Sequence, residues 1–526
     1  MATEPPPQRA WRAACPNCGA PVDFRSAASA FAVCSFCKST VVREGDALRK
    51  IGESAELFDD HTPLQLGAAG KAAGLPFTLV GRLQYRHAQG TWNEWHAFFD
   101  GGRSGWLSED NGGYVLAFDA PLQTSVPAAA SLRPGTALTV DGQAWSVASV
   151  AVAKLIAAQG ELPTTPNLER GFVVADLRNT RGEVGTLDYS DAQAPRWSVG
   201  KAVALADLAM TGLSEAAAEK TLKGRGLACP SCGAALEVKL TTTQSIACHQ
   251  CHAVVDVSQG LSGELKHYAQ GNGSTPQIPL GSMGTLALGG KVALPWQVVG
   301  YVERCEVATD ADDEQVFWRE YLLYHRNKGF AFLVDAEDGW SWTAPITGVP
   351  ESAGEAVKLD GTLYRKLYDY TGKVTYVLGE FYWPLQRDQT TFNTDYKGGG
   401  QAADKRLNRE QSGDEIVWSA GATLAADVVS QAFRLAPEQR AALKRDALPV
   451  SDNAASLLAK VFVWGFVIVV LLLVFRCSGD DECDTLRSKF GESSREFQSC
   501  LASQRSGGYR SGGGSFGGYS SGGSHK

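Results

Sequence analysis

Eight of the chain's twelve cysteines fall into two groups with one shared spacing, C-x2-C, a gap of fifteen residues, and a second C-x2-C. The groups are Cys15, Cys18, Cys34 and Cys37, and Cys229, Cys232, Cys248 and Cys251. Two such cysteine pairs wrap one metal ion with four thiolates, the ligand set of a structural zinc site. The spacing therefore predicts two zinc ribbons with one Zn²⁺ each, and a rubredoxin-like iron centre is the alternative. Four protein ligands leave no open coordination position, so a catalytic metal is not expected.

Two histidines, His249 and His252, flank the second group. Because its four cysteines already complete a ligand set, we expect both histidines to lie outside it. Cys305 stands alone in an apolar stretch and is expected to be a buried, unreactive thiol.

A second recurring pattern combines aromatic residues with an acid: Trp-x-Glu-aromatic at Trp92–Trp95 and at Trp318–Tyr321. Gly-Glu also recurs, at Gly160-Glu161 and Gly379-Glu380. One interpretation is structural, with aromatics on both faces of a sheet and each glutamate paired across strands. The other is an aromatic-lined groove that binds a peptide or a cationic ligand. The candidate binding residues on the second interpretation are Trp92, Glu94, Trp318, Glu320, Glu380 and Trp383.

Motifs for catalysis are not found in this sequence. It contains no P-loop, no H-E-x-x-H, no G-x-S-x-G and no evident Ser-His-Asp set. The sequence therefore predicts a protein that is not an enzyme.

Both cysteine groups begin a longer internal repeat. The cysteines are offset by 214 residues, Trp92 and Glu94 match Trp318 and Glu320 at an offset of 226, and Gly160-Glu161 matches Gly379-Glu380 at 219. Small changes in offset are typical of insertions in surface loops. The pattern indicates a tandem duplication of a metal knuckle followed by a larger body.

The bodies are predicted to be mainly β, because short aromatic and β-branched segments alternate with Gly, Asp and Asn. We expect a barrel-like or sandwich-like body in each copy, ending in a helix at residues 201–223 and again at 424–445. The expected divisions are zinc ribbon 1 at 10–45, β-rich copy 1 at 65–223, zinc ribbon 2 at 225–258, a Gly/Ser-rich linker at 259–290, β-rich copy 2 at 291–445, a transmembrane helix at 457–475, an extracytoplasmic segment at 476–504 and a disordered Gly/Ser-rich tail at 505–526.

The transmembrane prediction rests on residues 461–475, which are all apolar. The predicted helix at 457–475 has about the length that a bilayer core requires. Basic residues precede the stretch and acidic residues follow it. The positive-inside rule then places the N-terminal bulk in the cytoplasm and the tail outside, in a single-pass protein of the inner (plasma) membrane. Eight thiolates also suit a reducing compartment. On this topology Cys483 and Cys500 lie outside, either as a disulfide or as free thiols.

The second copy carries further motifs, listed here in chain order: Trp318–Leu323, Gly379–Trp383, Asp395-Tyr396, Leu407–Glu410 and Trp418–Gly421. On these motifs the chain resembles bacterial proteins of domain-of-unknown-function family 4178, over most of residues 65–435. The first copy departs from the pattern, since Gly160-Glu161 is not followed by Phe-Tyr-Trp. The resemblance implies a membrane-associated accessory role, because members lie beside genes for polyamine metabolism and small membrane proteins, and it supplies no catalytic residues.

These observations favour a non-enzymatic, membrane-anchored zinc-ribbon scaffold or adaptor that binds a protein partner at the cytosolic membrane face. A membrane-tethered nucleic-acid regulator that uses the ribbons is the alternative, with a mild positive bias around the first ribbon in its favour and a net charge of −8 against it. A second alternative is an enzyme or sensor for a small cationic ligand such as a polyamine.

Overall fold

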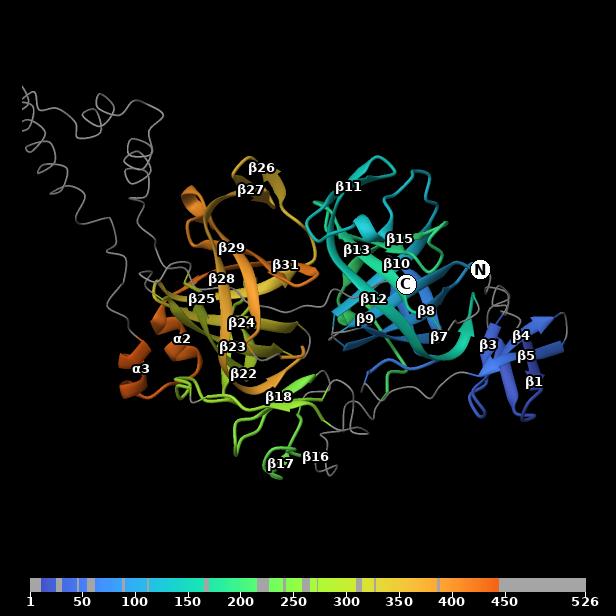
Figure 1. Cartoon of the computed structure of the whole chain (residues 1–526), viewed down its shortest axis with the longest axis horizontal. Coiled ribbons are helices and arrows are strands. Elements are labelled where there is room, and N and C mark those ends of the chain that lie inside the picture. Colours follow the sequence, from blue (N-terminus) through green and yellow to red (C-terminus); the bar gives the residue numbers. More distant parts are fainter. Residues whose placement is uncertain are drawn as a thin grey trace, which may run out of the picture. The chain divides into compact units, whose positions relative to one another are not determined.

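A computed structural model describes residues 11–24, 31–44, 47–53, 62–87, 90–110, 113–164, 170–214, 227–239, 243–257, 265–271, 273–308, 315–325, 328–385 and 388–443. The described part is mainly β, as predicted. It contains two copies of one arrangement, a small cysteine ribbon followed by a closed barrel (Figure 1).

The first barrel closes through antiparallel pairing of eight strands in the described residues. Their ring order is β7 (Leu75–His87), β8 (Gly90–Phe99), β9 (Ser104–Asp110), β10 (Gly113–Ala120), β15 (Arg196–Val203), β14 (Glu183–Asp188), β13 (Phe172–Arg178) and β12 (Gln143–Leu162), which returns to β7. Two short strands, β6 (Ala69–Ala72) and β11 (Ala137–Val140), extend β7 and β12.

The second barrel has the same order of connections. Its described ring is β22 (Leu294–Glu306), β23 (Phe317–His325), β24 (Gly329–Ala336), β25 (Gly339–Ile346), β31 (Glu415–Leu424), β30 (Lys405–Ser412), β29 (Thr390–Gly398) and β28 (Thr362–Phe381), which returns to β22. The attached short strands are β21 (Met283–Leu286), β26 (Glu351–Ala353) and β27 (Ala356–Leu359). Closure of the ring pairs both edges of each of its strands, so the barrel has few unpaired backbone groups.

Each barrel depends on one long, bent strand. In β28 the residues from Tyr364 to Lys373 pair with β29, those from Gly372 to Gly379 pair with β22, and Glu380 and Phe381 pair with the ribbon strand β18. β12 is shared in the same way between β13, β7 and the ribbon strand β3. Each ribbon is therefore joined to its barrel by continuous sheet.

The ribbons are small. The first contains β1 (Trp11–Ala14), β2 (Pro21–Phe24), β3 (Phe31–Val33), β4 (Ser39–Glu44) and β5 (Ala47–Glu53), and the second contains β16 (Leu227–Ala228), β17 (Ala235–Leu236), β18 (Ser245–Ala247), β19 (Val254–Asp256) and β20 (His267–Tyr268). Apolar ribbon residues enter the barrel cores. Ala247 and Val254 pack in one cluster with Trp318 and Phe381, and Val33 packs with Trp92.

The wall of the second barrel is buried on both its inner and its outer face at strand β23. Trp318 and Leu322 share the cluster that contains ribbon residues, whereas Tyr321 and Leu323 belong to another cluster. That second cluster holds Val429 of α2 (Ala426–Ala432), Phe433 directly after α2, and Leu443 of α3 (Pro437–Leu443). Because helices can cover only the outside of so small a barrel, Trp318, Glu320 and Leu322 point into its interior.

Three predicted segments need correction. The helix expected at 201–223 is wrong where it is described: residues up to Val203 complete β15, Leu205–Leu208 form a 3-10 turn, and residues 215–226 lie outside the described residues. The helix expected at 424–445 is two short helices, because Arg434 has a φ of 53° between them and Pro437 begins the second. The linker expected at 259–290 contains β20 and β21, which pair with β19 and β22.

The predictions for residues 457–475, 476–504 and 505–526, with Cys483 and Cys500, lie outside the described residues. Among helices in the part that is described, which ends at residue 443, none is long and apolar enough to cross a membrane.

Candidate metal centres

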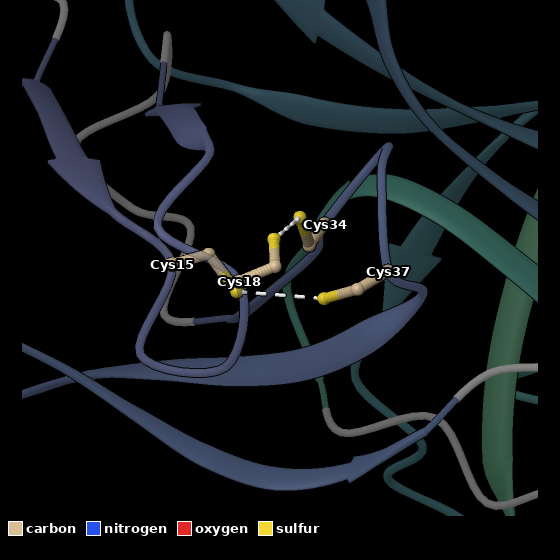
Figure 2. A group of neighbouring side chains, drawn as sticks. All are labelled: Cys15, Cys18, Cys34 and Cys37. Atoms are coloured by element: carbon tan, nitrogen blue, oxygen red, sulfur yellow. Dashed lines mark hydrogen bonds between the residues drawn. The ribbon is translucent and has the colours of Figure 1, made fainter.

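In each of the two cysteine groups the four sulfur atoms lie within 4.8 Å of one another. Figure 2 shows the first group. Cys15 Sγ lies 3.6 Å from Cys37 Sγ, and Cys18 Sγ lies 3.7 Å from Cys34 Sγ. The corresponding distances in the second group, from Cys229 to Cys251 and from Cys232 to Cys248, are both 3.7 Å. A tetrahedral zinc ion with bonds of about 2.3 Å requires sulfur atoms about 3.8 Å apart. All eight thiols are free, so both groups fit a metal ion and not a disulfide.

The turns that carry the cysteines follow one hydrogen-bond plan. In the first ribbon, Gly19 N–H donates to Cys15 O at 2.8 Å and Lys38 N–H donates to Cys34 O at 3.0 Å, and Gly233 and His252 make the same bonds in the second ribbon. The residue after each cysteine pair has positive φ: 75° at Gly19 and Gly233, and 58° at Lys38 and His252. Glycine adopts this conformation freely, whereas Lys38 and His252 adopt it at some cost in strain.

Polar groups around the sulfurs favour thiolate at one cysteine of each group. Hydrogen bonds from the side chains of Ser39 and Asn17 lower the pKa of Cys37 to about 5. The backbone N–H of Ala253 is the largest influence on Cys251, whose pKa is lowered to about 6. A lowered pKa prepares a thiol for metal binding, because the thiolate is the ligand.

His249 and His252 lie outside the cysteine sets. Among the described residues, each set consists of four cysteines and includes no histidine. The ring of His252 instead lies 6.2 Å from that of Tyr376 on the barrel. Cys305 is buried, as expected, and burial raises the pKa of its thiol.

Polar contacts strengthen the joint between the second ribbon and its barrel. Glu380 accepts hydrogen bonds from Lys239 N–H at 3.0 Å and from Thr243 Oγ1 at 2.6 Å. Ser245 Oγ accepts the Leu385 N–H at 2.9 Å. The Gly-Glu motif is thus the point where the barrel strand passes into the ribbon, and Gly379 and Gly160 bend the two strands there with φ values of 88° and 73°.

The six candidate binding residues are all interior. Relative exposures are 2% for Trp92, 0% for Glu94, 2% for Trp318, 0% for Glu320, 7% for Glu380 and 2% for Trp383. Their role in binding stays a prediction, and their positions match the structural interpretation of the same motifs.

A buried ionic cluster surrounds one of these residues. Arg304 Nε lies 3.2 Å from Glu320 Oε2, and Arg304 Nη1 lies 3.5 Å from Glu410 Oε2. Trp318 Nε1 donates to the other oxygen of Glu320 at 2.8 Å. Burial raises the pKa of Glu410 to about 7, with a further contribution from Glu320, while Arg304 and Thr391 oppose the shift.

Arg304 was not among the predicted site residues, and Glu410 was named only as the last residue of the motif Leu407–Glu410. The available signal was the charge of Arg304 two residues after the apolar Val302, on the same face of the strand. In the first barrel, Tyr85 takes the register position of Arg304, since it pairs with Trp92 as Arg304 pairs with Trp318. At this position the first barrel has a neutral side chain where the second has a cation.

The family comparison accounts for both barrels. A family described as "Domain of unknown function (DUF4178)" matches residues 65–205 and 289–426, more than half of the chain. The chain belongs to the DUF4178 family. It carries two DUF4178 domains, which confirms the predicted resemblance and the duplication, and the matched ranges cover the barrels and not the cysteine ribbons. Comparisons with curated proteins and with solved structures found no match.

Proposed function

We propose that this chain is a non-enzymatic scaffold in which two structural zinc ions stabilise ribbons that bind a protein partner, with residues 457–475 as a membrane anchor. The observation that carries the proposal is the closed ligand set: four sulfurs at tetrahedral spacing would fill every position of a tetrahedral ion, which suits a structural metal. The ribbons are joined to the barrels by continuous sheet, which suits presentation of a surface.

The exposed parts of the ribbons are the natural contact surface. Cys18 and Cys232 are exposed in their turns, and Phe36, between Cys34 and Cys37, has a relative exposure of 71%. Because the six candidate residues are buried, we place partner contact on these turns and assign Trp92, Glu94, Trp318, Glu320, Glu380 and Trp383 to supporting the barrels beneath. Two tethered modules would raise avidity for a repeated partner.

Metal content is the first test. Purified full-length protein should contain two zinc ions per chain by elemental analysis, Cys34→Ser or Cys248→Ser should each remove one, and Cys305→Ser should remove neither. Equal zinc in all variants would contradict the assignment of the ligands, and stoichiometric iron in place of zinc would contradict the metal.

Partner binding needs a separate measurement: crosslinking in cells followed by capture of the full-length protein, with and without nuclease. We expect defined proteins to be captured from the wild type regardless of nuclease, and to be reduced by Phe36→Ala but not by Gln250→Ala at the equivalent position of the second ribbon. Loss of captured proteins after nuclease would favour the nucleic-acid alternative.

A further inference from the structure

Asp395 and Asn408 form a buried pair inside the second barrel. They are direct partners in the β29–β30 register, and their relative exposures are 1% and 0%. Asn408 Nδ2 donates to Asp395 Oδ1 at 2.7 Å. The amide nitrogen of Asn408 and one carboxyl oxygen of Asp395 therefore have each other as hydrogen-bond partners.

The remaining oxygens of the two groups have no donor within hydrogen-bond geometry among the described residues. Neither Asp395 Oδ2 nor Asn408 Oδ1 has a hydrogen-bond partner among the described residues. An ionised carboxylate can only accept, and an amide oxygen can only accept, so two buried acceptors would stand without donors. Such groups are unfavourable in a dry interior. A proton on Asp395 Oδ2 would turn that atom into the donor that Asn408 Oδ1 lacks.

We propose that Asp395 retains a proton at neutral pH and donates it to Asn408 Oδ1, so that the pair forms a proton-binding site in the second barrel. The pair then makes two hydrogen bonds in opposite directions. Asn408 Nδ2–H donates to Asp395 Oδ1, and Asp395 Oδ2–H donates to Asn408 Oδ1. Neither group carries charge.

The surroundings of Asp395 agree with a neutral acid. Burial is the largest influence and raises the pKa of Asp395 well above its usual range, and the carboxyl of Asp338, between β24 and β25, raises it further. Asn408, the hydroxyl of Tyr370 on β28 and the guanidinium of Arg406 on β30 act in the opposite direction. The buried guanidinium of Arg304 is already shared between Glu320 and Glu410.

The first barrel provides a matched comparison. Asp176 occupies the corresponding position, and its register partner is Thr186. Thr186 Oγ1 donates to Asp176 Oδ1 at 3.0 Å, and the Arg178 guanidinium lies 4.0 Å from Asp176 Oδ2. A hydroxyl donor and a nearby cation suit an ionised carboxylate, so we place the proton site at Asp395 and use Asp176 as the comparison.

Infrared spectroscopy of the full-length protein tests this directly, because a protonated carboxyl group absorbs apart from a carboxylate. At about pH 7, we expect a protonated-acid band in the wild type and in Asp176→Asn. Asp395→Asn should lose the component of this band that comes from Asp395 and keep the component from Glu410. Absence of a band sensitive to Asp395→Asn would overturn the proposal.

Hydrogen exchange gives a second, independent readout. Asparagine is close in shape to a neutral aspartic acid and can donate Nδ2–H to Asn408 Oδ1. We therefore expect Asp395→Asn to keep the wild-type protection of β29 and β30, whereas Asp395→Ala should lose most of it. If Asp395→Asn lost protection as Asp395→Ala does, Asp395 would be ionised in the native protein. Carbon NMR of the wild type labelled at aspartate carboxyl groups gives the protonation state even if a variant fails to fold.

Discussion

Thr243 Oγ1 lies 2.6 Å from Glu380 Oε2, and this hydrogen bond fastens the second cysteine ribbon to the long strand β28 of its barrel. Lys239 N–H donates to the same carboxylate at 3.0 Å. Hydrogen bonds to a charged acceptor are stronger than those between neutral groups. This side chain therefore adds to the pairing of β18 with β28 in connecting the ribbon to the barrel.

Replacing Glu380 should loosen this joint. Glu380→Ala removes the acceptor of Thr243 and Lys239, and we expect the joint to lose about 1.5–3 kcal/mol. Hydrogen exchange should report faster exchange at residues 243–257 while the first ribbon is unchanged. Glu351→Ala, on the exposed strand β26, is the control. Unchanged exchange in Glu380→Ala would show that backbone pairing alone holds the ribbon.

Glu320→Gln should destabilise the second barrel, because Arg304 would lose one of its two buried carboxylates. Breaking a buried ion pair typically costs about 3–5 kcal/mol. The matched variant is Glu94→Gln, whose barrel has Tyr85 in place of the arginine, and we expect a smaller loss there. Thermal unfolding, monitored by the hydrogen-exchange protection of each barrel separately, distinguishes the effects of the two variants. Weakened partner capture without any loss of stability in Glu320→Gln would instead support direct binding by this residue.

The bend at the Gly-Glu motif requires glycine. A Cβ at Gly379 would lie 2.3 Å from Val299 O, and the backbone there has a φ of 88°. Gly361 has a φ of 76° in an Asp-Gly hairpin turn, but a Cβ there would meet nothing within 4 Å. Gly361→Ala should therefore cost about 1–2 kcal/mol of strain, whereas Gly379→Ala should cost more and should also expose the second ribbon to limited proteolysis. Equal effects in urea unfolding would contradict this.

Glu410 should make the second barrel less stable as the pH rises. The pKa of Glu410 is about 7 in the folded protein, against 4.5 as its ordinary value, so the folded state binds a proton that the unfolded state has released. The contribution of Glu410 to stability should decrease as the pH rises from about 4.5 to about 7 and should level off above that range. Glu410→Gln should reduce the slope of the second barrel's unfolding profile between these pH values, and the slope that comes from Asp395 should remain. An unchanged slope in Glu410→Gln would contradict the raised pKa of Glu410.

The cysteine groups and the β content could be predicted because both depend on local patterns. Two C-x2-C pairs constrain four sulfurs whatever surrounds them, and short aromatic and β-branched segments between Gly, Asp and Asn favour strands. The predicted helices failed for a different reason. Alanine and leucine at residues 424–445 favour helix, but the chain turns sharply at Arg434 so that Phe433 can cover Gly284 of β21.

Closure of the barrels and docking of the ribbons could not be predicted, because both rest on pairing between distant residues. Ser245 meets Phe381, and Phe31 meets Leu162, across more than a hundred residues of chain. The interior cluster was missed for the same reason: Arg304, Glu320 and Glu410 come from three strands, and only the closed ring brings them together. Composition could not reveal β21 in the expected linker, since its short segment gains its order from β22.

The shared strand at each joint also bears on the origin of the chain. Ribbon and barrel meet through the same two strands and the same Gly-Glu bend in both halves, β3 with β12 and β18 with β28. Two separate fusions would have had to arrive at one attachment point by coincidence. The ancestral segment therefore already held a ribbon grafted onto its barrel before it was copied, and the inherited module is longer than the DUF4178 domain alone.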